Sequence, residues 1–225
     1  MRSTLIALSL LSLIALPACA DQAPRAVAAP VVDETHVTSA TETAVFAGGC
    51  FWGIQGVFEH VKGVTKVVSG YSGGGVANPS YGQVSEGDTG HAESVRITFD
   101  PRQVTYGQLL QVFLSVAHDP TELNRQGPDD GTNYRSDIFT VTAEQQKIAT
   151  AYIAQLTKAH AFGEPIVTRV DKFAAFYPAE DYHQDYLIHH PDDGYIQIND
   201  LPKIANLRRI YPQLFREKPV TVAAR

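Results

Sequence analysis

The residue with the clearest chemical potential is Cys50. The chain of 225 residues has two cysteines, and Cys50 is the only one beyond the first twenty residues. It follows Gly48-Gly49 and precedes apolar residues at helical spacing, so it is predicted to lie in the first turn of a helix. Free backbone N–H groups and the helix dipole favour an anion there and lower the pKa of a thiol. These features favour a reactive thiol over the alternative, a small buried apolar residue.

Two aromatic residues, Phe51 and Trp52, follow the thiol directly. Phe51 fits the apolar face of the predicted helix, whereas Trp52 points about 100° away from it. Both can belong to the core, or they can form an apolar wall beside the thiol that suits a small group such as a methyl.

A candidate acid is Glu93, at the start of a stretch, residues 92–100, in which apolar and polar residues alternate. The alternation predicts a strand, and its period of two puts Glu93 on the apolar face. If the side chain is drawn inward, its pKa rises and it can donate a proton near neutral pH. The alternative is an exposed glutamate at a strand end.

Both strands and helices are predicted to position these residues. Strands are predicted at residues 43–47, 64–69, 92–100, 136–141 and 166–170. Helices are predicted at 51–61, 105–117, 142–161, 181–189 and 201–210, the third opened by a capping box of Thr142 and Gln145. A long polar loop at 119–134 has the length of a functional loop.

The N-terminal segment is set apart from this pattern. Residues 1–20 combine Arg2 with a short apolar run and predict a secretion signal, too short for a membrane span. Cleavage after Ala20 and a lipobox ending at Cys19 are both compatible with the sequence. We expect a flexible linker at 21–41, the folded domain at 42–216 and a tail at 217–225. The protein is then exported, to a bacterial periplasm or to a lipid anchor on the envelope.

Charge and composition narrow the partners. The net charge is −6 without a basic cluster, which argues against nucleic acid. Membrane contact is expected only through lipid on Cys19, and a monomer is expected. No metal is predicted, because the adjacent residues His189 and His190 point about 100° apart on a helix.

The motifs around these candidates resemble a known family, the peptide methionine sulfoxide reductases of the A type. The resemblance extends over residues 43–215 and several blocks in order. The blocks are Gly49-Cys50-Phe51-Trp52-Gly53, Gly70-Tyr71-Ser72-Gly73-Gly74, Asn78-Pro79-Ser80-Tyr81, Gly90-His91-Ala92-Glu93, His118-Asp119-Pro120-Thr121, Asn124-Arg125-Gln126-Gly127 and Gly131-Thr132-Asn133-Tyr134-Arg135-Ser136.

The resemblance implies roles for single residues. Cys50 is the nucleophile that attacks the sulfoxide sulfur, and Glu93 supplies the proton to the sulfoxide oxygen. Tyr81 and Tyr134 hydrogen-bond that oxygen. For substrate binding, Asp129 orients the loop and the substrate, and Phe51 and Trp52 hold the S-methyl group.

The resemblance also implies the reaction and the fold. The S epimer of methionine sulfoxide, free or in proteins, is reduced through a Cys50 sulfenic acid, which repairs oxidised envelope proteins. The fold is α+β, a two-layer sandwich with a mostly antiparallel or mixed sheet and a ferredoxin-like core with long loops.

One departure from the family concerns recycling. Many relatives have recycling cysteines near the C-terminus, but residues 194–200 read Gly-Tyr-Ile-Gln-Ile-Asn-Asp. The chain resembles the single-cysteine branch, which needs no organic cofactor but an external thiol, either thioredoxin-like or of the glutathione and glutaredoxin kind. Two rival functions are a Cys–His hydrolase using His91 or His118, and an envelope binding lipoprotein in which the thiol is incidental.

Overall fold

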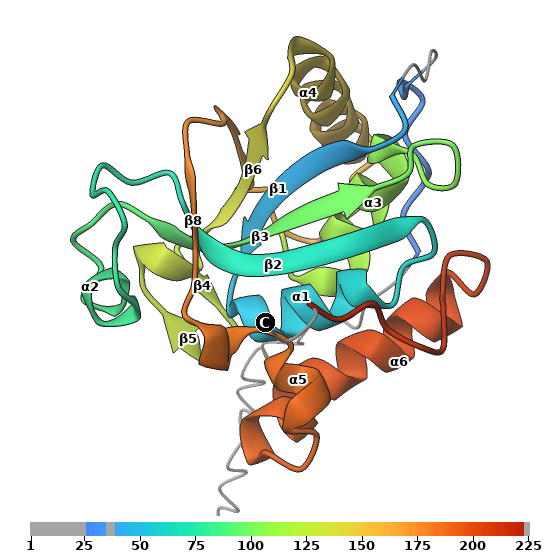
Figure 1. Ribbon diagram of the computed structural model, residues 1–225. Coiled ribbons are helices and arrows are strands. Elements are labelled where there is room, and N and C mark those ends of the chain that lie inside the picture. Colours follow the sequence, from blue (N-terminus) through green and yellow to red (C-terminus); the bar gives the residue numbers. More distant parts are fainter. Residues whose placement is uncertain (1–25, 35–38, 223–225) are drawn as a thin grey trace, which may run out of the picture.

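A curled six-stranded sheet forms the centre of the molecule in the computed structural model, which describes residues 26–34 and 39–222 (Figure 1). The strands run in the order β7-β6-β1-β3-β2-β8, and a separate hairpin pairs β4 with β5. Their bounds are β1 Glu42–Gly48, β2 Val64–Ser72, β3 Ala92–Phe99, β4 Arg125–Gln126, β5 Asp129–Asp130, β6 Ser136–Thr140, β7 Arg169–Lys172 and β8 Phe176–Pro178.

The longer helices contribute to the main core on one face of this sheet. The α-helices are α1 Phe51–Glu59, α2 Tyr81–Ser85, α3 Tyr106–Val112, α4 Ala143–Lys158, α5 Tyr186–His189 and α6 Leu201–Ile210. Four short turns of other helix types are η1 Phe113–Ala117, η2 Thr132–Tyr134, η3 Asp181–His183 and η4 Ile196–Asp200. No helix within the described residues is long and apolar enough to cross a membrane.

The pairing of the strands confirms the predicted fold class. Strand β3 lies between β1 and β2 and is antiparallel to both, and β6 is antiparallel to β1 on the other side. The order β6-β1-β3-β2 is that of a ferredoxin-like split βαβ arrangement. Only the edge strand β7 pairs in parallel, so the sheet is mixed but mostly antiparallel.

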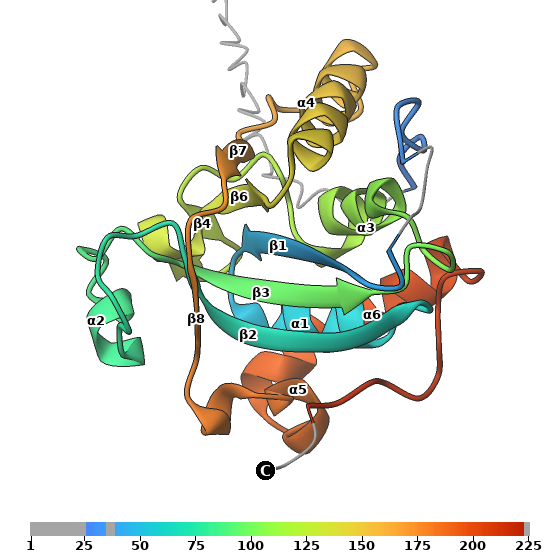
Figure 2. The same cartoon turned by 45° about the horizontal axis from the view of Figure 1, so that its top comes forward.

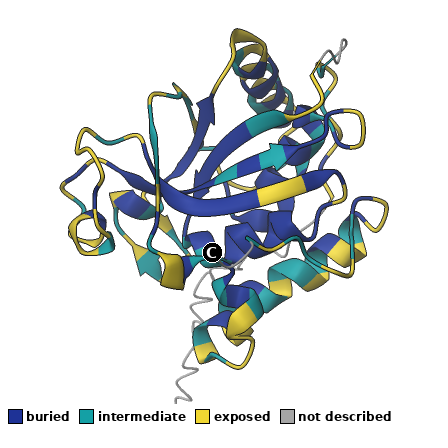
Figure 3. Cartoon of the chain, viewed as in Figure 1, coloured by how far each residue is buried: buried dark blue, intermediate teal, exposed yellow. Residues whose placement is uncertain are grey.

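The two faces of the sheet bury different clusters, as the two-residue period of strands requires. In β1, Phe46 belongs to the main core under α1 and α3, whereas Val45 belongs to a small cluster on the opposite face. The central strands β6, β1, β3 and β2 are mostly buried, apart from two exposed residues of β2, and exposure is concentrated on the outer faces of α4 and α6 and on the loops (Figures 1 and 3). Glu93 shares the face of Val95 in the main core, so it points toward α1.

Several predicted helix and strand boundaries differ from those in the structure. The predicted helix 105–117 ends as α3 and continues as the π-type turn η1. Gln145 does not complete a capping box, because its side-chain oxygen accepts from Val141 N and its amide donates to Thr43 O. The strand expected at 166–170 begins only at Arg169. The long loop 119–134 contains the β4–β5 hairpin and η2, and both α2 and β8 were missed.

Residues 26–34 contradict part of the predicted flexible linker. Val27 is buried, and its backbone N–H donates to the Tyr211 hydroxyl at 3.3 Å. Asp33 accepts from the Thr105 hydroxyl and from Gly107 N at 2.5 and 2.9 Å, at the start of α3 (Figure 2). A carboxylate at a helix N-terminus satisfies its free N–H groups, so this segment is held to the domain. The predicted signal 1–20 lies outside the described residues.

A buried carboxyl pair lies where α1 ends. Glu59 is fully buried, and neither of its carboxyl oxygens has a hydrogen-bond partner among the described residues. Asp185 lies beside it and accepts from Gln55 Nε2 and Val222 N. Burial, reinforced by Asp185, raises the pKa of Glu59 to about 10. The Glu59 carboxyl therefore keeps its proton at neutral pH, and that proton is what allows two acids to face each other.

This pair predicts a pH-dependent stability. The pKa of Glu59 is higher in the folded chain than the ordinary value of about 4.3, so its stabilising effect is complete below that pH and declines as pH rises toward about 10. Glu59→Gln, which keeps a donor facing Asp185, should raise the free energy of unfolding at pH 8 by about 1–3 kcal/mol. The gain should vanish near pH 4.

Guanidinium unfolding at both pH values measures this difference. The matched control is Glu86→Gln, the same change at an exposed carboxyl. An equal effect of Glu59→Gln at pH 4 and pH 8 would contradict the raised pKa.

Candidate active site

Cys50 occupies the N-cap position of α1, one residue before the predicted first turn. Gly49 before it has φ +100°, and a Cβ there would lie 2.5 Å from the Gln126 side chain. Only glycine meets both demands, since other residues are strained at such a φ. The turn from β1 into α1 thus lets the chain pass under Gln126 and leaves Cys50 half-buried at the helix end.

The environment of the thiol corrects the prediction of a lowered pKa. Burial raises the pKa of Cys50 well above its ordinary value, and the negative charges of Glu93 and Asp200 raise it further. The backbone N–H of Trp52 and the charge of Lys203 lower it, but less. Loss of hydration outweighs the helix N-terminus at this site, so in the unliganded enzyme the sulfur holds its proton.

Glu93 is drawn inward, which decides between the two alternatives for it. Its side chain is 2% exposed, and Glu93 Oε2 accepts a hydrogen bond from Phe51 N at 3.0 Å. Burial raises the pKa of Glu93 to about 8, against the opposing effect of the Phe51 N–H and with a small contribution from Asp129. The acid predicted from strand alternation is therefore protonated at neutral pH and lies beside the thiol.

The two predicted tyrosines reach the same place from separate loops. Tyr81 begins α2, where its backbone N–H donates to Glu180 Oε1 at 2.8 Å. Tyr134 ends η2. Burial raises the pKa of both phenols, followed by the charge of Glu93, and Cys50 contributes to each. Both phenols thus lie in the electrostatic field of the thiol and the acid, and both keep a proton to donate.

Phe51 and Trp52 form the predicted aromatic wall, together with His183, which was not predicted from the sequence. Phe51 is buried 5.0 Å from the His183 ring centre, and Trp52 Nε1 donates to His183 Nδ1 at 3.1 Å. Trp52 also stacks on Tyr186 with ring centres 3.8 Å apart. Because His183 accepts through Nδ1, its neutral form carries the proton on Nε2. His183 lies in the stretch 181–189 that was predicted only as a helix. Nothing in the sequence indicated its contact with Trp52.

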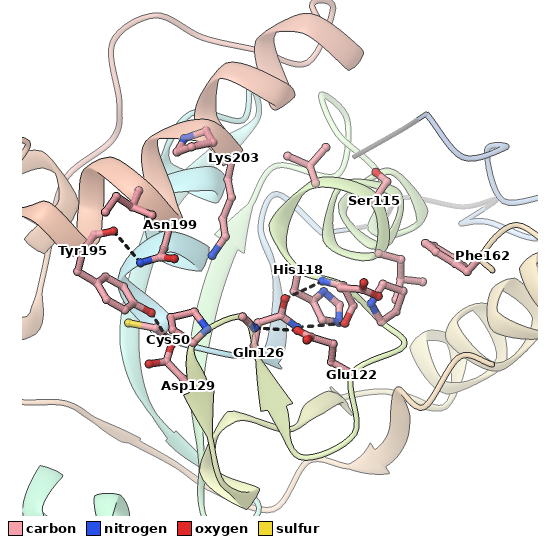
Figure 4. Close-up of a pocket in the computed structure, with 18 residues that line it drawn as sticks. Cys50, Ser115, His118, Glu122, Gln126, Asp129, Phe162, Tyr195, Asn199 and Lys203 are labelled. Carbon is pink, nitrogen blue, oxygen red and sulfur yellow. Dashed lines mark hydrogen bonds between the residues drawn. The ribbon is translucent and has the colours of Figure 1, made fainter. Parts of the chain in front are cut away.

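Asp129 is engaged by a second residue that was missed, Tyr195. The Tyr195 hydroxyl donates a hydrogen bond to Asp129 Oδ2, and the Tyr195 ring meets Trp52 edge-on at 6.1 Å. Burial raises the pKa of Tyr195, and Cys50 adds to the shift. Tyr195 therefore ties the C-terminal segment to the loop of Asp129 directly beside the thiol (Figure 4).

The ion pair between Asp200 and Lys203 explains why the residue after Trp52 is glycine, Gly53. A Cβ on Gly53 would lie 2.0 Å from Asp200 Oδ1, so only glycine leaves room for this fully buried carboxyl against α1. Lys203 Nζ lies 2.9 Å from the same oxygen. Both residues of the pair lie at the N-terminus of α6, where their side chains pack against Gly53 in the first turn of α1.

A cavity of about 290 Å³ opens onto Cys50 (Figure 4). Its walls come from η1, the loop before β5, η4 and the start of α6. The lining residues are Cys50, Leu114, Ser115, Val116, His118, Asp119, Pro120, Glu122, Gln126, Gly127, Pro128, Asp129, Phe162, Tyr195, Ile198, Asn199, Pro202 and Lys203.

The histidines do not form a Cys–His pair. His118 pairs through its two ring nitrogens with Phe113 O and the Ser136 hydroxyl, at 2.9 and 2.6 Å. Burial lowers its pKa to about 4. His91 is engaged by Gly74 N and Val76 O. Both rings are occupied away from Cys50, which removes the base that the hydrolase alternative requires. In the part of the chain described, no three His, Cys, Asp or Glu residues are grouped to hold a metal ion.

The comparisons with known proteins agree on one family. The family model described as peptide methionine sulfoxide reductase matches residues 42–214. The chain is 60% identical to peptide methionine sulfoxide reductase MsrA 2 of Mesorhizobium japonicum, over 81% of this chain and 93% of that protein. It is 54% identical to MsrA 2 of Synechocystis, over 81% and 86%.

Solved structures give the same answer. The crystal structure of reduced Mxr1 from Saccharomyces cerevisiae is similar with a TM-score of 0.62 and 30% identity, over 71% of this chain and 91% of that one. Methionine sulfoxide reductase A of Corynebacterium diphtheriae is similar with a TM-score of 0.59 and 35% identity, over 75% and 82%. The chain therefore belongs to the peptide methionine sulfoxide reductase family, as an oxidoreductase of the MsrA type, a peptide-methionine (S)-S-oxide reductase.

Proposed function

We propose that the enzyme reduces the S epimer of methionine sulfoxide, free or in proteins, through a sulfenic acid on Cys50. The observation that carries this proposal is the pairing of a half-buried thiol with a buried carboxyl that holds its proton at neutral pH. A sulfoxide oxygen is a poor leaving group until it is protonated. Reduction therefore needs a sulfur nucleophile and an acid at one substrate atom.

The step balances with the groups present. The Cys50 thiol loses its proton to solvent as its sulfur attacks the sulfoxide sulfur, while Glu93 delivers a proton to the oxygen. The S–O bond of the substrate breaks, a new bond forms between that oxygen and the Cys50 sulfur, and the products are methionine and the Cys50 sulfenic acid. The substrate sulfur is reduced by two electrons and the Cys50 sulfur is oxidised by two. Glu93 is then reprotonated from solvent.

The remaining predicted residues have supporting roles in this proposal. The Tyr81 and Tyr134 hydroxyls, whose pKa values are raised, donate to the sulfoxide oxygen and stabilise its developing charge. Phe51 and Trp52 receive the S-methyl group. Asp129, held by Tyr195, orients its loop and the bound substrate.

The cellular setting is part of the proposal and rests on sequence alone. Residues 1–20 have the features of a secretion signal, so we place the enzyme in the periplasm or on a lipid anchor at Cys19, where it repairs oxidised envelope proteins. Only Cys50 remains in the described residues as a free thiol, so the sulfenic acid is reduced by an external thiol, a thioredoxin-like protein or a glutathione-type reductant.

Removing the acid should slow the chemical step while leaving the fold intact. In Glu93→Gln the side-chain oxygen can still accept from Phe51 N, but no proton can be donated. Single-turnover methionine formation should fall by about 10²- to 10⁴-fold. Cys50→Ser gives the zero-activity baseline, and Glu86→Gln is the matched exposed control. Quenched-flow sampling with chromatography of methionine measures the rate, and equal rates for Glu93→Gln and wild type would rule out the proton-donor role.

The reactivity of the thiol should report its surroundings. Alkylation of free enzyme by iodoacetamide should rise with a midpoint above the ordinary value of about 8.5, because burial raises the Cys50 pKa. Above pH 8 Glu93 is ionised and opposes the thiolate. Glu93→Gln removes that charge, so its midpoint should move to lower pH. A wild-type midpoint below 8.5 would show that the helix N-terminus dominates instead; Glu86→Gln should behave as wild type.

A further inference from the structure

The Tyr81 hydroxyl and the Glu93 carboxyl have to be held in fixed positions relative to each other. Under the proposed function, on which this inference rests, both groups act on the same sulfoxide oxygen. A hydrogen-bond donor stabilises a developing charge best when it is already in place before the reaction begins. The contacts that fix Tyr81 are therefore part of the catalytic apparatus.

Helix α2, which begins at Tyr81, is poorly suited to fix that residue alone. It has five residues, of which only Val84 is buried, and it lies in the loop between β2 and β3 at the side of the sheet (Figures 1 and 2). A helix this short depends on tertiary contacts. The other tyrosine, Tyr134, is followed by Arg135, whose ion pair with the fully buried Asp137 anchors the turn η2 to β6.

Glu180 supplies the corresponding contact for Tyr81 from a distant part of the chain. Its Oε1 accepts a hydrogen bond from Tyr81 N at 2.8 Å, and its Oε2 accepts one from the Tyr71 hydroxyl at 2.9 Å. Burial would raise the pKa of Glu180, but these and other hydrogen bonds lower it below its ordinary value. The ionised carboxylate thus joins α2 to strand β2 with both of its oxygens.

Glu180 is itself fixed to the sheet. Gln184, in the same segment, makes hydrogen bonds to Ser69 N and Ser69 O, both at 3.0 Å, which extend the pairing of β8 with β2. His183 N donates to Glu180 O at 2.9 Å, and the His183 ring lies 4.5 Å from the Tyr81 ring. The segment that carries Glu180 therefore contacts Tyr81 both at its backbone and at its ring.

Tyr71 connects this carboxylate to the strand pair that bears the acid. Tyr71 is fully buried in the main core, and its partner in the register of β2 and β3 is Glu93. Its ring also lies 5.9 Å from the ring of Phe51. A buried phenol needs one acceptor, which accounts for only one of the two Glu180 oxygens. The other oxygen serves Tyr81.

We propose that Glu180 is a positioning residue for sulfoxide reduction. Its hydrogen bonds to Tyr81 N and to the Tyr71 hydroxyl set the place of α2 against β2, and thereby the place of the Tyr81 hydroxyl beside the Glu93 carboxyl. Glu180 itself touches neither the sulfoxide nor Cys50, and its effect on the reaction passes through Tyr81.

Two changes at Glu180 separate its hydrogen bonds from its charge. Glu180→Ala removes both acceptors. Glu180→Gln removes the charge but can keep both bonds, because its amide oxygen can accept from Tyr81 N while its amide N–H donates to the Tyr71 hydroxyl oxygen. The matched control is Asp181→Ala, at the exposed carboxyl next in the chain. Single-turnover methionine formation is measured over a range of methionine S-sulfoxide concentrations.

The expected result is a loss of rate without a matching loss of binding, since the charge on the oxygen grows only as the S–O bond breaks. In Glu180→Ala the saturating rate should fall by about 10- to 100-fold, as for a misplaced donor. The half-saturating concentration should change by less than about threefold, because Phe51 and Trp52 still receive the methyl group. Glu180→Gln and Asp181→Ala should keep saturating rates within about threefold of wild type.

Two results would overturn the proposal. The first is an unchanged saturating rate in Glu180→Ala. The second is a rate in Glu180→Gln as low as that in Glu180→Ala, which would show that the charge of Glu180 acts and not its hydrogen bonds.

A double-mutant cycle tests whether the effect passes through Tyr81. In a chain that already carries Tyr81→Phe, adding Glu180→Ala should change the saturating rate by less than about twofold, because no hydroxyl remains to be misplaced. A further loss as large as that of Glu180→Ala alone would mean that Glu180 supports another group, and the proposal would fail.

A second variant covers a failure to fold. Glu180→Ala leaves the buried Tyr71 hydroxyl without its acceptor, whereas the double change Tyr71→Phe/Glu180→Ala removes that hydroxyl as well. Compared with Tyr71→Phe alone, the double change should show the same loss of rate as the single change at Glu180. The amplitude of methionine formation counts the folded enzyme, so misfolding lowers the amplitude and not the rate.

Failure of the proposed function gives a different result. If Tyr81→Phe alone is as fast as wild type, the hydroxyl has no part in the reaction, and the roles given to Tyr81 and Glu180 both fail. If wild type forms no methionine from the S-sulfoxide, the proposed function itself fails, and this inference fails with it.

Discussion

One hydrogen bond, from Phe51 N to Glu93 Oε2, joins the parts that the chemistry requires. It connects the first turn of α1 to strand β3, and thereby places the acid next to the N-cap cysteine. A buried carboxyl needs such a partner, because an unsatisfied oxygen in this position carries a large desolvation penalty. A single neutral N–H satisfies the carboxyl without forcing it to ionise. The rest of the structure holds Glu93 in place. It brings too little positive charge near the carboxyl to remove its proton.

The environment of Glu93 and Cys50 also keeps both groups protonated. Burial raises the pKa values of both Glu93 and Cys50, and the charge of Glu93 raises the pKa of Cys50 further. Between them the two groups therefore hold protons in the unliganded enzyme, and the reactive combination of thiolate and carboxylic acid forms when a substrate that can accept the proton is present. The phenols of Tyr81 and Tyr134 add donors without adding charge. The site is prepared for a neutral polar S–O bond, and it keeps the thiol unreactive in the absence of substrate.

Much of this site follows from local sequence patterns. The alternation in β3 was sufficient to place Glu93 on the core face, and Gly48-Gly49 before an amphipathic stretch was sufficient to place Cys50 at a helix start.

The order of the central strands needed the family resemblance, since no local pattern fixes strand order. The raised pKa of Cys50 could not be predicted from the helix position, because it depends on burial by segments distant in sequence, Asp200 among them. Tyr195 and His183 act through contacts with Asp129 and Trp52, 66 and 131 residues away. Residues 26–34 look like a linker by composition, and only their tertiary hydrogen bonds show otherwise.

The most direct test of the central claim adds one equivalent of methionine S-sulfoxide to the fully reduced enzyme without any reductant. Intact mass and free-thiol titration are followed together, with the R epimer as control. The account predicts one methionine per enzyme, loss of the Cys50 thiol and a gain of one oxygen, with no reaction of the R epimer. An unchanged thiol with no methionine formed would contradict the proposed chemistry of Cys50 and Glu93.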